Sequence, residues 1–291
     1  MKEKLNLGKR IYRTIQNSVT LNGIGVHSGI KTRVKLLPSD EGISFIKKEN
    51  DATKIIASID NVVNTVHGTT IGNGTVSFGM VEHLLGALLG FEIDGMTIVF
   101  EKGDELPILD GSALPIVEKF RNIKIIEKKV VKRDNEVIID KPFLFNFGKS
   151  HLALYPSPKL VISYFINYEN YPELTQMKTV EVTQEHFVKE IAPARTYAFH
   201  EWVEPLRKQG LIKGGSLENS LVYSKKGLLN KTPLRFKDEF VRHKILDFIG
   251  DLLLLEKRVV GHFVILCGGH TAHIAFLKQL KKIIDREEYE N

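Results

Sequence analysis

The segment of residues 238–255 constrains the fold most, because its spacing predicts a long helix that is apolar on nearly every side. Its apolar side chains are Ile245, Leu246, Phe248, Ile249 and Leu252 to Leu255. A helix of this kind is buried rather than amphipathic. His243 and Asp247 lie four residues apart on one face of it, so both are expected to be buried as well. Buried ionisable groups need partners.

An imidazole and a carboxylate at this spacing can bind one metal ion. Zinc takes nitrogen from histidine and oxygen from aspartate, so His243 and Asp247 could supply two of its ligands. Asp251 continues the same line of side chains one turn further on. The alternative is an ordinary ion pair on a helix. Spacing alone leaves both open, and the expected burial favours the metal.

Composition limits the class of protein. The chain has 291 residues, of which 43% are hydrophobic and 26% charged, as in soluble globular proteins of one large domain or two ordinary ones. Cys267 is the only cysteine, so no internal disulfide can form. The sequence holds no apolar stretch long enough for a transmembrane helix, and its basic start lacks the apolar core of a signal peptide. We therefore expect a cytoplasmic protein.

The net charge is weakly informative about partners. Lys plus Arg (41) minus Asp plus Glu (35) gives +6, which favours anionic partners such as nucleic acid, phosphorylated small molecules or an anionic membrane surface. The lysines are, however, mostly interleaved with acidic residues along the chain. The sequence also lacks a helix-turn-helix, zinc-finger or RNP signature. A nucleic-acid-binding protein is therefore the weakest of the functions considered.

Hydrophobic spacing predicts two halves of similar plan, in which strands precede helices and a late strand follows. The first half has expected strands at 31–37, 42–47 and 96–100, and helices at 81–89 and 116–120. The second has expected strands at 136–140, 143–147, 160–166 and 262–266, and helices at 201–209, 238–255 and 272–286. This order favours an α+β fold over alternating βαβ units. The charge-rich residues 121–135 are the expected junction.

The helix at 81–89 contains a second polar pair, Glu82 and His83, within an apolar surround. Adjacent helical residues point about 100° apart, so one could bind a metal while the other faces what lies beside it. The alternative is an acidic residue that offsets the helix dipole next to a hydrogen-bonded core histidine. We expect Ser77 to cap the start of this helix and Gly90 to end it in a left-handed conformation.

Two more segments carry chemically useful groups. Gly268 and Gly269 precede His270 after a strand, where glycines let a backbone approach a ligand closely. Thr196 has a hydroxyl that could donate a hydrogen bond to a charged intermediate. His262 and His273 lie near the glycines in less distinctive settings. A metal hydrolase uses metal ligands, a carboxylate, an imidazole and a hydroxyl, and these segments together provide each of these groups.

These residues lie in an ordered series of motifs that resembles the bacterial UDP-3-O-acyl-N-acetylglucosamine deacetylases, which catalyse the committed step of lipid A synthesis. The motifs are TIQNSVTLNGIGVHSG at 14–29, VEHLLGALLG at 81–90, ELPILDGSA at 105–113, ARTYAF at 194–199, KGGSLENSLV at 213–222, LRFKDEFVRHKILDFIGDLLLL at 234–255 and GGH at 268–270. Three positions depart from the family: His273 replaces a usual Asn, Cys267 a common basic residue, and only Glu201 and Glu204 lie near the acidic position after ARTYAF.

The resemblance implies two βααβ sandwich domains, each a sheet packed on two helices, with the active site between them. The expected domains are residues 1–128 and 129–291, with an acyl-chain passage in an insert near 195–215. It further implies hydrolysis of the N-acetyl group of UDP-3-O-(3-hydroxyacyl)-N-acetylglucosamine to the free amine and acetate. The enzyme would be a monomer with at most peripheral membrane contact. A zinc amidase that acts on another nucleotide-sugar or acyl-amide is the alternative.

The resemblance also implies a role for each site residue. Zn²⁺, or Fe²⁺ in the cell, would be held by His83, His243 and Asp247. Glu82 would be the general base and His270 the general acid, oriented by Asp251. Lys244 and Thr196 would stabilise the oxyanion and contact the substrate. The remaining expected substrate contacts are Phe199, Trp202, Leu206, Leu211 and Ile212.

Overall fold

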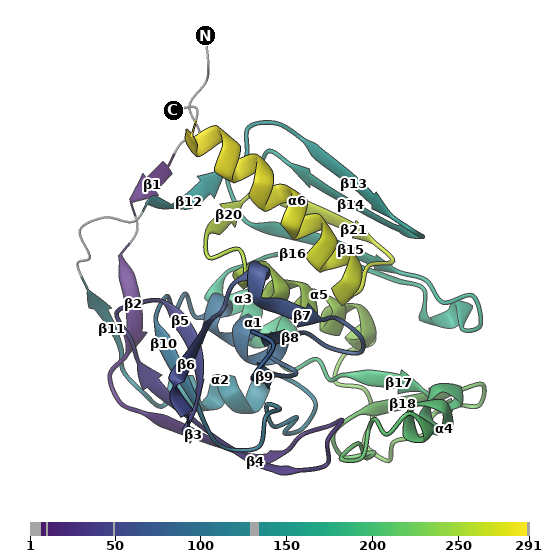
Figure 1. The fold of residues 1–291 in the computed structure, drawn as a ribbon. Coiled ribbons are helices and arrows are strands. Elements are labelled where there is room, and N and C mark those ends of the chain that lie inside the picture. The colour runs from purple at the N-terminus through teal and green to yellow at the C-terminus, as the bar shows by residue number, and fades with distance from the viewer. Residues whose placement is uncertain (1–6, 10, 49, 129–133, 290–291) are drawn as a thin grey trace.

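Two five-stranded sheets dominate the computed structural model, which describes residues 7–9, 11–48, 50–128 and 134–289 (Figure 1). The first sheet has the order β3 (Val19–Ile24), β4 (Lys31–Pro38), β10 (Met96–Lys102), β5 (Ile43–Lys47), β6 (Asn50–Ile56). The second has the order β13 (Phe143–Phe147), β14 (Ser150–Tyr155), β21 (His262–Leu266), β15 (Val161–Ile166), β16 (Gln176–Glu181). In each sheet the late strand, β10 or β21, lies in the middle.

The two sheets share one pairing pattern. β10 is antiparallel to β4 and parallel to β5, and β21 is likewise antiparallel to β14 and parallel to β15. A helix precedes each middle strand and another follows it: α1 (Glu82–Gly90) and α2 (Leu114–Arg121) in the first half, α5 (Glu239–Leu253) and α6 (His270–Tyr289) in the second. The halves thus repeat one plan, and the predicted α+β class with two βααβ sandwiches is confirmed.

The equivalent helices α1 and α5 pack against each other between the two sheets (Figure 1). A Cβ atom on Gly250 would lie 2.1 Å from the carbonyl oxygen of Glu82, and one on Gly86 would lie 2.9 Å from the Leu246 side chain. Glycines at both positions therefore let the helices approach closely. Because α5 also packs against β15, β16 and α6, it is covered on nearly all sides, as its apolar composition predicts.

The other described elements are short and lie around this framework. The peripheral strands form small sheets of two or three strands. One contains β1 (Leu7–Lys9), β12 (Asp134–Ile138) and β20 (Arg258–Val260), and another contains β2 (Tyr12–Ile15) and β11 (Ile125–Lys128). A third contains β7 (Val62–Asn64), β8 (Thr70–Gly72) and β9 (Ser77–Phe78), and a fourth contains β17 (Tyr197–Phe199), β18 (Leu221–Ser224) and β19 (Gly227–Leu228). The short helical segments are η1 (Ile59–Asn61), η2 (Pro172–Leu174), α3 (Gln184–His186), η3 (Phe187–Ile191) and α4 (His200–Lys208). None of the described helices is long and apolar enough to cross a membrane.

The structure corrects both predicted ends of α1. Ser77 lies in β9, and the helix begins after Val81 without a side-chain cap. Gly90 is the last helical residue but has no positive φ; the left-handed residue is Glu92, with φ 55°. A Cβ atom on Gly90 would lie 2.3 Å from the Phe187 ring. The glycine is therefore explained by close packing, not by backbone conformation.

The predicted junction between the halves lies partly outside the described residues, at 129–133. Up to residue 128 the chain forms β11, which pairs with β2 of the first half. From residue 134 it forms β12, which pairs with β20 of the second half and also with β1. The domain boundary at 128/129 therefore stays a prediction.

The segment predicted as an insert is part of the outlying unit of α4, β17 and β18 (Figure 1).

Candidate metal and acid–base site

Three buried candidate ligands meet where α1 and α5 cross. His83 is the second residue of α1, and His243 and Asp247 lie on successive turns of α5. One ligand atom from each residue lies within 4.8 Å of the others. The Nε2 atoms of His243 and His83 lie 3.3 Å and 3.7 Å from Asp247 Oδ1. The two equivalent helices of the repeat therefore build one group of side chains.

This group has the donor set that a divalent metal ion requires. His243 Nδ1 lies 3.1 Å from the carbonyl oxygen of Ala194, which can only accept, so Nδ1 carries the hydrogen and Nε2 keeps its lone pair. Burial lowers the pKa of His243 to about 3, so the ring is neutral near neutral pH. Two imidazole nitrogens and one carboxylate oxygen match a catalytic zinc site with one position open.

Lys244 lies beside the group and faces the same cavity. Its Nζ donates to Asp247 Oδ2 at 2.7 Å, which leaves Oδ1 toward the two histidines. Burial acts to lower the pKa of Lys244, but the Asp247 carboxylate outweighs it and raises that pKa above its ordinary value. The ammonium group is therefore a fixed positive charge at the wall of the cavity.

Glu82 precedes the candidate ligand His83 and is almost fully buried. Its Oε2 accepts a hydrogen bond from the backbone N–H of Thr69 at 2.9 Å, which orients the carboxyl group. Burial raises the pKa of Glu82, and the nearby His270 and His83 only partly oppose this shift. A carboxylate of raised pKa at a cavity wall is suited to accept a proton from water.

His270 is the first residue of α6 and lines the same cavity as Glu82 and His83. Its Nδ1 donates to Asp251 Oδ2 at 2.9 Å, and its Nε2 lies 3.7 Å from Asp247 Oδ2. Burial acts to lower the pKa of His270, but the carboxylates of Asp251, Asp247 and Glu82 raise it to about 9. The imidazole is therefore protonated at neutral pH and able to act as a general acid.

These groups line one cavity of about 270 Å³ between the halves. Four predicted contact residues also line it: Thr196, Trp202, Leu206 and Ile212. Gly268, which the sequence analysis noted for a close backbone approach, also lines the cavity. The lining residues that sequence reasoning missed are Val26, His27, His67, Met80, Ile108, Tyr168, Tyr197, Ala198 and Ser220. Val26, Met80 and Ile108 form a small apolar cluster of the first half, which provides a second apolar part of the cavity lining.

Two predicted contacts do not line this cavity. Phe199 is buried, stacks on Tyr171 at a ring-centroid distance of 4.3 Å and meets the edge of Trp202 at 4.6 Å, so it supports a lining residue instead. Leu211 lies next to the lining residue Ile212, and its backbone N–H bonds the carbonyl of Leu206. Successive side chains of a strand point to opposite faces, which fits Ala198 of β17 lining the cavity and its neighbour Phe199 not lining it.

Thr196 is held at the junction of the halves by backbone contacts. Its N–H donates to the Gly111 carbonyl at 2.7 Å, and its own carbonyl accepts from Leu221 N–H at 2.8 Å. Arg235 donates to Asp110 Oδ2 at 2.7 Å and to the carbonyl of Pro193, so it ties the same loop to the segment before Thr196. The threonine is thereby placed at the cavity by both halves.

Two histidines at the cavity, His27 and His67, lie forty residues apart in the sequence, so their spacing does not predict that they meet. His27 Nε2 lies 3.1 Å from the His67 carbonyl oxygen, and His27 Nδ1 is buried without a partner among the described residues. Both His27 and Ser28 donate backbone hydrogen bonds at 2.8 Å to the Glu105 carboxylate, which shapes this loop. The motif at 14–29 was the available signal, but no role was derived for it.

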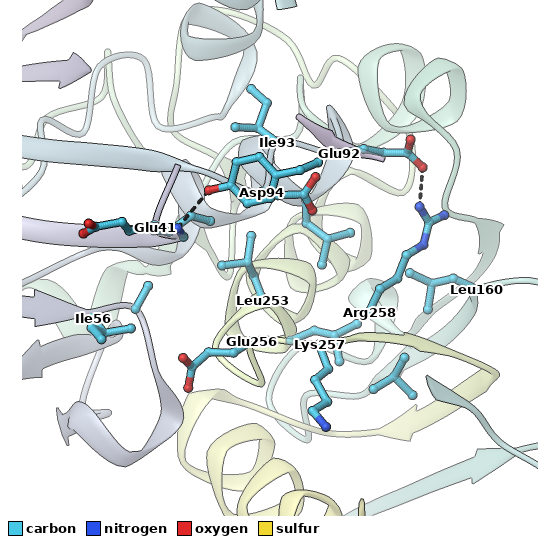
Figure 2. Close-up of a pocket in the computed structure, with 17 residues that line it drawn as sticks. Glu41, Ile56, Glu92, Ile93, Asp94, Leu160, Leu253, Glu256, Lys257 and Arg258 are labelled. Atoms are coloured by element: carbon cyan, nitrogen blue, oxygen red, sulfur yellow. Dashed lines mark hydrogen bonds and ion pairs between the residues drawn. The ribbon is translucent and has the colours of Figure 1, made fainter. Parts of the chain in front are cut away.

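A second cavity, of about 170 Å³, lies at the other ends of α1 and α5 (Figure 2). Of its carboxylates, Glu92 pairs with Arg13 and Arg258, and Glu41 pairs with Lys54. Asp94 accepts a hydrogen bond from the backbone N–H of Arg13. The described lining residues include no histidine, cysteine or serine. The candidate metal-binding and acid–base groups thus lie at the first cavity.

Comparison with known proteins agrees with this geometry. A sequence profile described as LpxC, UDP-3-O-acyl N-acetylglycosamine deacetylase, matches residues 12–282. The UDP-3-O-acyl-N-acetylglucosamine deacetylase of Thermodesulfovibrio yellowstonii is 39% identical over 273 residues, which cover 92% of this chain and 91% of the relative. The protein of that name from Teredinibacter turnerae is 38% identical, with 95% and 92% covered. The Lawsonia intracellularis protein is 40% identical, with 92% and 88% covered.

Proposed function

Because this chain belongs to the UDP-3-O-acyl-N-acetylglucosamine deacetylase family, we propose that it hydrolyses the N-acetyl group of a UDP-3-O-(3-hydroxyacyl)-N-acetylglucosamine to a free amine and acetate. The product would be committed to lipid A synthesis. The observation that carries the proposal is that the candidate ligands share one cavity with Glu82 and His270. Mass-spectrometric detection of the deacetylated sugar nucleotide tests it. Hydrolysis of a different acyl-amide by the same residues is the alternative outcome.

His83, His243 and Asp247 would hold the metal ion, and the two-nitrogen, one-oxygen donor set favours zinc. When bound, zinc would polarise the acetamide carbonyl and lower the pKa of a water molecule toward about 7. Asp247 would remain an anion in this role, because the Lys244 ammonium and the protonated His270 hold its pKa well below the ordinary value despite its burial. The ligands would therefore be in the protonation states that metal binding needs.

The proton transfers follow from the positions of two side chains. Glu82 would take a proton from the water whose oxygen bonds to the carbonyl carbon. The Lys244 ammonium and the Thr196 hydroxyl would donate hydrogen bonds to the carbonyl oxygen as it gains negative charge. His270 would give its proton to the sugar nitrogen, so that the C–N bond breaks with a neutral amine as the leaving group. Acetate is the second product.

This assignment predicts a bell-shaped dependence of kcat/KM on pH. Activity needs Glu82 ionised, so it falls in acid below the raised pKa of that carboxyl group. Activity also needs His270 protonated, so it falls in base as the pH passes about 9. Initial rates between about pH 5 and pH 10 measure both limbs.

The His270→Gln variant serves as the control for the basic limb. It should lose most of the rate, by about 10²–10⁴-fold, and any residual activity should no longer fall near pH 9 through loss of this proton. A wild-type profile that rises steadily through pH 10 would rule out a protonated histidine as the acid.

The apolar part of the cavity lining is the proposed acyl-chain site. Trp202, Leu206 and Ile212 from the outlying unit share the cavity with the first-half cluster Val26, Met80 and Ile108. Each buried methylene contributes about 0.8 kcal/mol, so several of them account for orders of magnitude in binding. The acylated substrate should therefore have a far higher kcat/KM than UDP-N-acetylglucosamine, measured with the same enzyme.

Adjacent leucine and isoleucine residues provide a matched pair for this test. Ile212→Ala should reduce the preference for the acylated substrate, because Ile212 lines the cavity, whereas Leu211→Ala should leave the ratio close to wild type. Equal kcat/KM values for the acylated and unacylated substrates in the wild-type enzyme would contradict an acyl site here, although not the metal group.

The site needs only one copy of the chain, since each proposed catalytic group and ligand comes from the described residues of a single molecule. We therefore also propose that the enzyme works as a monomer in the cytoplasm, with the nucleotide-sugar lipid precursor as its substrate. Sedimentation of the purified protein tests the first point: activity confined to a dimer fraction would contradict it.

A further inference from the structure

His273 lies one turn after His270 on α6, and its ring is fully buried. Its Nδ1 is 2.9 Å from Asp251 Oδ2, the oxygen that also accepts from His270, and its Nε2 is 2.8 Å from the Tyr164 hydroxyl. We propose that Tyr164 and His273 form a hydrogen-bond relay that positions Asp251 and, through it, the His270 ring. This inference rests on the proposed deacetylation, in which His270 is the acid.

The contacts determine where each proton lies in the relay. Asp251 is ionised, because His270 and His273 lower its pKa against the effect of burial, and a carboxylate only accepts hydrogen bonds. His273 Nδ1 must therefore donate to it, which leaves Nε2 to accept from the Tyr164 hydroxyl. Burial raises the pKa of Tyr164 well above 10 and lowers that of His273, so a neutral phenol donates to a neutral imidazole.

The relay completes a set of three donors around Asp251. The Thr69 hydroxyl donates to Oδ1 at 2.6 Å, while the two imidazoles donate to Oδ2. A carboxylate bound through both oxygens cannot rotate without losing a hydrogen bond. The His270 Nδ1–H is then held between Asp251 Oδ2 at 2.9 Å and the Thr69 hydroxyl oxygen at 3.1 Å. Its Nε2 is directed to the cavity side, near Asp247. His273 is therefore a positioning residue that does not touch substrate.

The turn before α6 leaves room for this relay. A Cβ atom on Gly268 would lie 2.7 Å from the Tyr164 hydroxyl and 3.0 Å from His273 Nε2. Gly268 also lines the catalytic cavity. Any larger residue there would have to displace the hydrogen bond between Tyr164 and His273.

Substitution of His273 separates positioning from simple core packing. His273→Leu should lower kcat by about tenfold or more, with KM within about twofold and metal content unchanged, because Asp251 loses one donor. His273→Asn should recover most of kcat, since its amide restores an N–H for Asp251. Tyr164→Phe removes the hydroxyl that donates to His273 Nε2, so this variant should also have a lower kcat than wild type. His262→Leu is the control, because His262 bonds Ser163 on the other face of the sheet and should leave kcat unchanged.

Nitrogen NMR of the zinc-loaded wild-type protein tests the relay without activity. The expected signature is a neutral His273 with its proton on Nδ1 and a hydrogen-bonded, unprotonated Nε2. A proton on Nε2 instead, or a folded His273→Leu variant with wild-type kcat, would overturn the relay. If the wild-type protein fails to deacetylate the substrate, the proposed function falls, whereas the NMR signature still decides the proton positions.

Discussion

His243→Ala is expected to abolish turnover and to release most of the bound metal. The substitution removes one of three ligands, and it leaves the Asp247 carboxylate buried beside Lys244 with one imidazole fewer. The purified wild-type protein should hold about one divalent ion per chain, and the variant much less at the same free metal concentration. Elemental analysis after dialysis, together with the deacetylation rate, measures both effects.

An exposed histidine provides the control for this experiment. His151 lies on β14 of the second sheet with an exposed side chain, and its Nδ1 lies 2.8 Å from Asn146 Oδ1. His151→Ala should therefore retain metal and activity. Circular dichroism of both variants checks that they are folded. Full metal occupancy together with normal turnover in His243→Ala would show that the ligand assignment is wrong.

Glu82→Gln is expected to keep the metal and lose the reaction. Glutamine has the shape of glutamate, and its carbonyl oxygen can still accept the Thr69 N–H bond, so the site should remain assembled. An amide cannot take a proton from water, so kcat should fall by about 10²–10⁴-fold while substrate binding changes little. Single-turnover rates and metal content of the same preparation separate chemistry from binding.

The outcome for Glu82 also separates two mechanisms of proton transfer. If Glu82 and His270 act at different steps, the Glu82→Gln variant should lose the acidic limb of its pH profile and keep the basic limb near pH 9. Loss of both limbs at once would mean that the glutamate carries both transfers. Near-normal kcat in Glu82→Gln would remove it from the mechanism.

The helix at 238–255 shows how much of this site could be predicted from local spacing. Apolar residues on all sides predicted its burial, and the interval of four predicted that His243 and Asp247 share a face. Both features depend only on helix geometry, which is why they agree with α5. The approach of His83 could not be predicted in this way, because it depends on the contact of α1 with α5 through Gly86 and Gly250. Only the resemblance to a family connected the two helices.

Long-range packing accounts for the remaining differences. Gly90 was expected to adopt a left-handed conformation. Glycine is needed there instead because the ring of Phe187, which is distant in the sequence, leaves no room for a Cβ atom. Likewise, Val26, Met80 and Ile108 come from three segments of the first half, and their common position at the cavity depends on tertiary structure. Local patterns identify elements, whereas contacts between distant residues place the cavity wall.

We propose that this chain removes the N-acetyl group of an acylated UDP-N-acetylglucosamine with a metal ion held by His83, His243 and Asp247. The most direct measurement is mass spectrometry of UDP-3-O-acyl-N-acetylglucosamine incubated with the purified protein, before and after chelation and again after added zinc. We expect a free amine and an equal amount of acetate, loss of the reaction in chelator, and its return with zinc. Unchanged substrate in the presence of zinc, or equal turnover by the metal-free protein, would contradict it.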